Sequence, residues 1–148
     1  DRAGVRLVFR RMSANPFLDS AFHIRWSTLA PEHVASAIEA ALAQARAAVE
    51  EIAGRDLGSL TYANTFLALE NSTEALNLAW AKVTHLQSVV DSPALRDAHN
   101  AMLPGVSAFY ASIPLNAGLW RRLKAVAATA EEAARKWRRE SESGVMTG

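Results

Sequence analysis

Two glutamates and two histidines are the side chains of this sequence whose types and spacing could support chemistry. Glu70 and Glu74 lie four residues apart, so a helix would place their carboxylates on one face, one turn apart. With the imidazole of His85 or His99, the two carboxylates could hold a cation or act as general acid and base in a hydrolysis. The alternative is an exposed acidic face beside two packed histidines, and we favour this structural interpretation over a catalytic site.

The motifs of self-sufficient catalytic sites are missing from the chain. No two of its four histidines are three to five residues apart, which excludes the His-Glu-x-x-His helix of zinc hydrolases. There is no Gly-x-Ser-x-Gly turn, no Gly-rich phosphate loop, and no Cys that could serve as a thiolate nucleophile. The sequence therefore predicts neither a metal site nor a cofactor site on this chain.

Length and composition restrict the chain to one domain. Its 148 residues are 50% hydrophobic, which is enough apolar material for a compact core and excludes a disordered chain. No run of 18 apolar residues occurs, and the first residues contain no apolar stretch typical of a secretory signal. We therefore expect a cytoplasmic protein without a membrane partner.

The net charge of +1 conceals an uneven distribution. Residues 1–12 carry a net +3 and residues 120–148 another +3, whereas residues 13–119 carry a net −5. A nucleic-acid partner would require cations clustered on the folded body, so the acidic middle segment argues against one.

Apolar residues at helical spacing predict the elements that must position these side chains. The first predicted helix spans residues 31–53, with apolar residues at intervals of three and four, and Gly54 ends it. The second spans residues 61–90, with Thr61 as its N-cap, and it carries both glutamates and His85.

Two further helices complete the predicted fold. One spans residues 93–113 and contains Pro104, which removes a backbone hydrogen bond, so we expect a kink or a break there. The last spans residues 116–139. Short connections favour antiparallel neighbours, and the fold class predicted is an all-α antiparallel bundle of about four helices.

The bundle domain is predicted to span residues 15–139. Residues 1–14 form a basic N-terminal extension, with a short possible strand at residues 5–9, and residues 140–148 form a frayed tail.

Several short stretches, taken in their order and spacing, carry a family resemblance. They are Asn15-Pro16-Phe17-Leu18, Pro31-Glu32-His33-Val34, Thr61-Tyr62-Ala63-Asn64-Thr65, Leu69-Glu70, Ala79-Trp80, Val83-Thr84-His85-Leu86, Ser92-Pro93-Ala94-Leu95-Arg96 and Leu103-Pro104. Together they resemble the beginning of the thimet oligopeptidase and oligopeptidase A family of zinc metallopeptidases. The resemblance covers about residues 15–128.

The resemblance implies an N-terminal helical domain that forms one wall of a deep substrate channel. In this family the zinc ion and its His-Glu-x-x-His helix belong to a separate, larger C-terminal domain, which this sequence does not contain. It therefore implies no peptidase activity of the chain by itself, and we expect a fragment or a shortened reading frame. The implied partners are the missing catalytic domain, short peptides, or a second copy in a homodimer that covers surface left exposed.

Two other functions stay open at this point. A small helical bundle could have a hydrolase activity of its own, seated at His85, His99, Glu70 and Glu74. Alternatively, a binding or scaffold module could use the two basic ends of the chain to hold an acidic partner.

Overall fold

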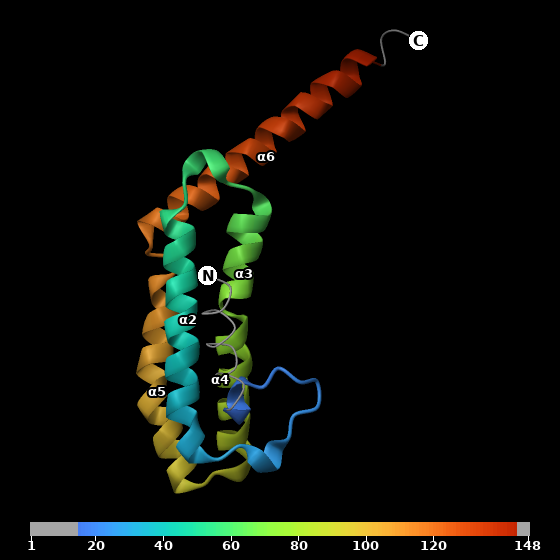
Figure 1. Ribbon diagram of the computed structural model, residues 1–148. Coiled ribbons are helices and arrows are strands. Elements are labelled where there is room, and N and C mark those ends of the chain that lie inside the picture. The colour runs from blue at the N-terminus through green and yellow to red at the C-terminus, as the bar shows by residue number, and fades with distance from the viewer. Residues whose placement is uncertain (1–14, 145–148) are drawn as a thin grey trace, which may run out of the picture.

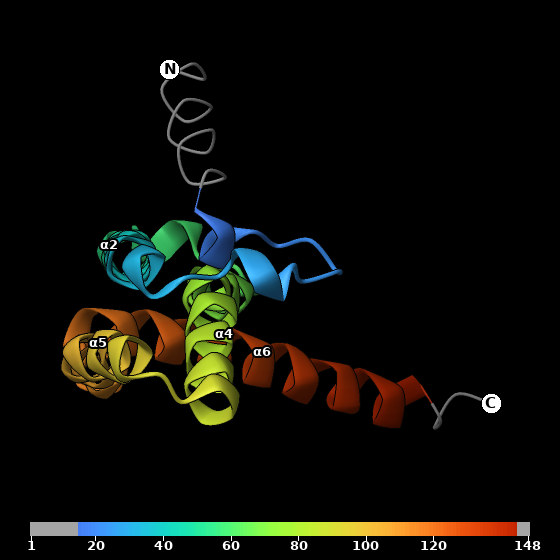
Figure 2. The same cartoon turned by 90° about the horizontal axis from the view of Figure 1, so that it is seen from below.

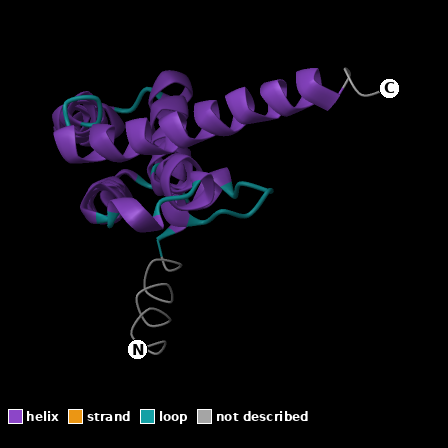
Figure 3. Ribbon diagram, turned by 90° about the horizontal axis from the view of Figure 1, so that it is seen from above, coloured by secondary structure: helices purple, strands orange, loops and turns teal. Residues whose placement is uncertain are grey.

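The structure is a computed structural model that describes residues 15–144, and within this range it contains helices and no strand (Figure 3). Four long helices are α2 (Val34–Gly54), α4 (Glu74–Val90), α5 (Pro93–Ser112) and α6 (Ala117–Gly144). A short helix, α3 (Ala68–Ser72), precedes α4. The predicted all-α fold class is confirmed.

Short helical turns precede α2 and join it to α3. Four of them are 3₁₀ turns: η1 (Pro16–Leu18), η2 (Trp26–Thr28), η3 (Pro31–His33) and η4 (Leu57–Ser59). The fifth, η5 (Ala63–Leu67), is a π-helical turn that leads into α3.

The long helices lie side by side except for α6. In Figure 1 the chain runs up through α2, down through α3 and α4, and up again through α5. Helix α6 crosses the end of the bundle and continues past it, which Figure 2 shows from below. Helix α2 contacts α4, α5 and α6, so it is the helix around which the others are packed.

The core forms along one stripe of α2. Its buried side chains recur at intervals of three and four: Val34, Ile38, Ala41, Ala45, Val49 and Ile52. Ala41 takes the place in this stripe that the sequence spacing gave to Leu42, which is only partly buried. Leu76 and Val83 of α4 and Phe109 of α5 pack against this stripe. Phe17, in η1, is also fully buried, so the segment before α2 is part of the core.

The predicted helix 61–90 is interrupted in two places. Its start is capped as predicted, because the Thr61 hydroxyl accepts a hydrogen bond from the Asn64 backbone N–H, 3.1 Å away. The first turn is then the π-helical η5, and Thr73 separates α3 from α4. The hydroxyls of Ser72 and Thr73 donate to the carbonyls of Leu69 and Glu70, which competes with the regular helix pattern.

The later helices also differ in detail from the predictions. Helix α5 is continuous through Pro104, so residues 93–112 are one helix and not two; a kink at this proline stays a prediction. Helix α6 extends through Gly144, beyond the end predicted for the last helix at residue 139; the fraying of the tail stays a prediction. The i,i+4 ion pair between Lys136 and Glu140 (3.9 Å) reaches into this extension. Residues 1–14, with the possible strand 5–9, and residues 145–148 lie outside the described residues.

Asn116 fixes the beginning of α6 against the end of α2. Its Oδ1 accepts a hydrogen bond from the Leu119 N–H (2.9 Å), and its Nδ2 donates to Glu50 of α2 (3.1 Å). We expect Asn116→Ala to lower the free energy of unfolding by about 1–2 kcal/mol in urea denaturation. Asn116→Ser keeps a capping oxygen and should recover most of this loss. Equal stability of the alanine variant and the parent chain would contradict the capping role.

Candidate functional site

The structure places both candidate glutamates on an outer surface of the bundle. Glu70 lies in α3 and Glu74 begins α4, on either side of the break at Thr73. Both side chains are exposed, as the structural interpretation of an acidic face requires. Their exposure leaves each carboxylate in contact with water.

The two candidate histidines pack against tryptophan rings. The ring of His85, on α4, lies 4.8 Å from the ring of Trp26 in η2, measured between centroids, with the planes tilted by 48°. The ring of His99, on α5, is stacked on Trp80 of α4 at 4.8 Å and 17°. Both imidazoles thus help to join elements that are distant in the sequence.

These four side chains do not form one site. Glu74 and His85 are separated by 11 residues along α4, which is a distance of about 16 Å along the helix axis. Among the residues that the structure describes, no group of three or more His, Cys, Asp or Glu side chains could hold a metal ion. The family resemblance assigns the zinc ion to a separate domain, and no zinc chemistry is assigned to the described residues.

A surface cavity of about 240 Å³ lies between α2 and the end of α5. Its floor is apolar and its rim carries a cation and a carboxylate; the lining residues are Arg46, Val49, Glu50, Phe109, Ser112 and Asn116. The Arg46 guanidinium lies over the Phe109 ring, 5.7 Å from its centroid. The cavity could contact an apolar group that carries a charge, such as one end of a peptide.

The cavity lining offers no activated nucleophile. The Ser112 hydroxyl donates to the backbone carbonyl of Phe109, 2.6 Å away, and no histidine lines the cavity to act as its base. Glu50 accepts the hydrogen bond from Asn116 and is thereby tied to the beginning of α6.

A buried lysine joins the segment before α2 to α4. Lys82 of α4 is only 6% exposed, and its ammonium group donates to the backbone carbonyls of Phe17 (3.1 Å) and Asp19. Burial lowers the pKa of Lys82, and the nearby Asp19 carboxylate opposes this shift. The side chain holds η1 onto α4.

The Asp19 carboxylate stabilises the segment between η1 and η2. It accepts a hydrogen bond from the Ala21 N–H at 3.0 Å, and this bond lowers the pKa of Asp19. Arg25, whose guanidinium lies 3.5 Å from the carboxylate, lowers this pKa further.

The sequence did not predict the cavity or the buried lysine. Arg46 and Glu50 lie on the polar face of α2, and their spacing alone is typical of an exposed ion pair. Lys82 follows the buried Ala79 at an interval of three, which is the signal that could have placed it on the packed side of α4.

The described residues form an all-α helical domain with a surface cavity beside α2. Comparison with known proteins identifies its family: the description "Neurolysin/Thimet oligopeptidase, N-terminal domain" matches residues 32–140. This chain belongs to that family, as the sequence resemblance predicted. The matched range includes α6 almost to its end, farther than the resemblance recognised in the sequence.

Three oligopeptidase A proteins are similar to the chain over most of its length. That of Haemophilus influenzae is 31% identical over 80% of this chain, and that of Salmonella typhimurium is 33% identical over 72%. The protein of Escherichia coli is 31% identical over 72%. The chain spans only 15–17% of the length of these relatives. No solved structure matches the chain significantly.

Within residues 15–144, no helix combines the length and the apolar composition that crossing a bilayer requires.

Proposed function

We propose that this chain is the substrate-channel wall of an oligopeptidase and that it does not cleave peptides by itself. The observation that carries the proposal is the family match, which falls on the N-terminal domain and covers residues 32–140. The zinc-bearing catalytic domain is its partner in this proposal. More than four-fifths of each relative's length lies outside the region that aligns with this chain.

Two features of the chain support a role in peptide binding. The cavity beside α2 holds the exposed Arg46 guanidinium over the Phe109 ring, where it can meet a peptide carboxylate. The acidic segment 13–119 favours peptides of net positive charge, because it lowers the electrostatic potential along the body. Both interactions position a peptide and leave its bonds intact.

The absence of intrinsic activity has a direct test. We expect the purified chain, supplied with Zn²⁺, to hydrolyse a panel of quenched-fluorescence short peptides no faster than buffer does. Oligopeptidase A assayed beside it serves as the positive control. Zinc-dependent cleavage that co-elutes with the chain would overturn the proposal. If alanine substitution of Glu70, Glu74, His85 and His99 abolished that cleavage, the hydrolase alternative would be correct.

A further inference from the structure

One apolar face of α6 continues beyond the bundle. Residues 127–141 are all exposed, and we call this range the α6 arm; Figure 1 shows it projecting past the other helices. The arm continues the helix face that packs into the body. The residues of this face are spaced by three and four: Leu119, Leu123, Val126, Ala130, Ala133 and Trp137.

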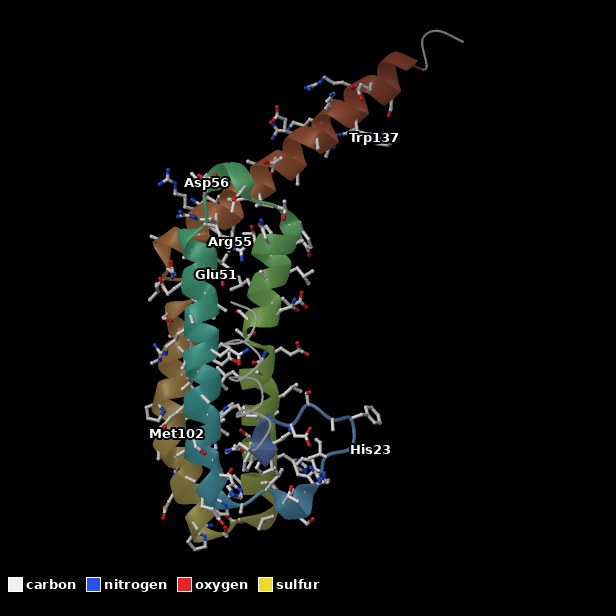
Figure 4. All side chains as sticks on the ribbon, in the orientation of Figure 1. His23, Glu51, Arg55, Asp56, Met102 and Trp137 are labelled. Carbon is white, nitrogen blue, oxygen red and sulfur yellow. The ribbon has the colours of Figure 1, made fainter. Side chains whose placement is uncertain are left out.

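The burial of this face decreases along the helix. Leu119 is 1% exposed, Leu123 is partly buried against the core, and Trp137 is 69% exposed. Figure 4 shows Trp137 on the arm, well away from the bundle. The apolar face ends at Trp137, because Glu140 takes the next position and forms an ion pair with Lys136 (3.9 Å). An apolar face that is buried at its beginning is thus left uncovered over its second half.

The composition of the uncovered part suits contact with protein. Ala130 and Ala133 leave room for the side chains of an opposing element, and Trp137 is of the residue type that most often anchors protein interfaces. A helix bound to a membrane surface would need a broader face of large apolar side chains.

The family match supplies an independent observation about the arm. The description of the N-terminal domain matches residues 32–140, so it includes nearly the whole arm. The arm is therefore part of the domain that the family shares, and not an appendage of this chain. In the oligopeptidase A proteins more than four-fifths of the length lies outside the aligned region. That remainder is the polypeptide available in the family to cover the face.

We propose that the apolar face of the α6 arm is the surface on which the remainder of an oligopeptidase packs. This inference rests on the proposed function, which makes the rest of the enzyme the partner of this chain, and it names the surface of contact. The arm then joins the channel wall to the larger part of the enzyme, and Trp137 is buried between them. In this chain alone, the arm depends on its own helix propensity and on its i,i+4 ion pairs.

Hydrogen exchange measured by mass spectrometry tests this contact on two intact proteins. Oligopeptidase A of Haemophilus influenzae and this chain are compared under the same conditions. The segment of oligopeptidase A that corresponds to residues 127–140 should exchange at least about tenfold more slowly than the arm of this chain, because it is covered there and exposed here. Equal exchange rates in the two proteins would overturn the proposal.

A matched pair of substitutions tests the face itself. Ala133→Asp places a charge on the apolar face, whereas Ala128→Asp makes the same change on the opposite side of the helix. Both positions are exposed in this chain, so the two variants should unfold at the same temperature. In a chimera that carries residues 32–140 in place of the matching region of oligopeptidase A, only Ala133→Asp should lower the unfolding temperature, by at least about 2 °C. Equal unfolding temperatures of the two chimeric variants would contradict the proposal, and the exchange comparison decides it if the chimera does not fold.

Two other results would assign the face to a different partner and would also overturn the proposal. Self-association of this chain that Ala133→Asp abolishes, measured by sedimentation equilibrium, would assign the face to a second copy. Binding to anionic phospholipid vesicles that Trp137→Ala abolishes would assign it to a membrane surface. Failure of the proposed function has a different sign, because peptide cleavage by the isolated chain would contradict that function and leave the exchange rates unchanged.

Discussion

Replacing Phe109 with alanine should lower the free energy of unfolding by about 3–5 kcal/mol, the largest loss that we expect from a single substitution. The Phe109 ring is 1% exposed and fills the contact between α5 and α2. Removing the ring loses the free energy gained by burying its apolar surface. It also leaves a cavity that the neighbouring helices cannot close completely. The Arg46 guanidinium would also lose the ring beneath it.

Phe22 offers a matched control for this substitution. Its side chain is 94% exposed, so Phe22→Ala should change stability by less than about 0.5 kcal/mol. Chemical denaturation followed by circular dichroism measures both variants on the same helical signal. Similar losses for the two variants would mean that α5 does not pack on α2 as the structure has it.

The fold could be predicted because each long helix carries its own apolar stripe. Val34, Ile38 and Val49 recur at helical spacing in the sequence and are buried in the structure. The break at Thr73 was not predicted, because it depends on hydroxyl groups that bond to the backbone one turn earlier. The spacing of apolar residues predicts which face of a helix is buried, but it does not predict hydrogen bonds from hydroxyl groups to the backbone.

The candidate site was harder to predict because it depends on which helix faces meet. The spacing of Glu70 and Glu74 predicted one shared face, but it contained no information about the break at Thr73 between them or about their neighbours. His85 and His99 meet Trp26 and Trp80, from other elements. The cavity likewise combines residues of α2, α5 and the following turn, and no local pattern joins these segments. Tertiary packing determines such sites.

Replacing Lys82 with methionine should lower the free energy of unfolding by about 2–3 kcal/mol at neutral pH. Methionine keeps most of the apolar stem but leaves the carbonyls of Phe17 and Asp19 without their donor. The loss should be greatest for the segment before α2, because Lys82 ties η1 to α4. Hydrogen exchange or limited proteolysis of residues 15–33 should therefore report faster opening in the variant. The exposed Lys124→Met is the matched control and should leave this segment unchanged.

The pH dependence of the same variant separates the charge of Lys82 from its hydrogen bonds. Burial lowers the pKa of Lys82 below its ordinary value of 10.5, so the unfolded chain binds more protons than the folded chain between these two values. At neutral pH the buried ammonium charge of Lys82 therefore lowers the free energy of unfolding by its full amount. This destabilisation is lost as the pH rises through 10.5 and the amine becomes neutral in both states. The parent chain should gain stability relative to Lys82→Met over this alkaline range, since a neutral amine still donates to both carbonyls. A stability difference that shrinks as the pH rises would show that the ammonium charge, and not its hydrogen bonds, holds η1 in place.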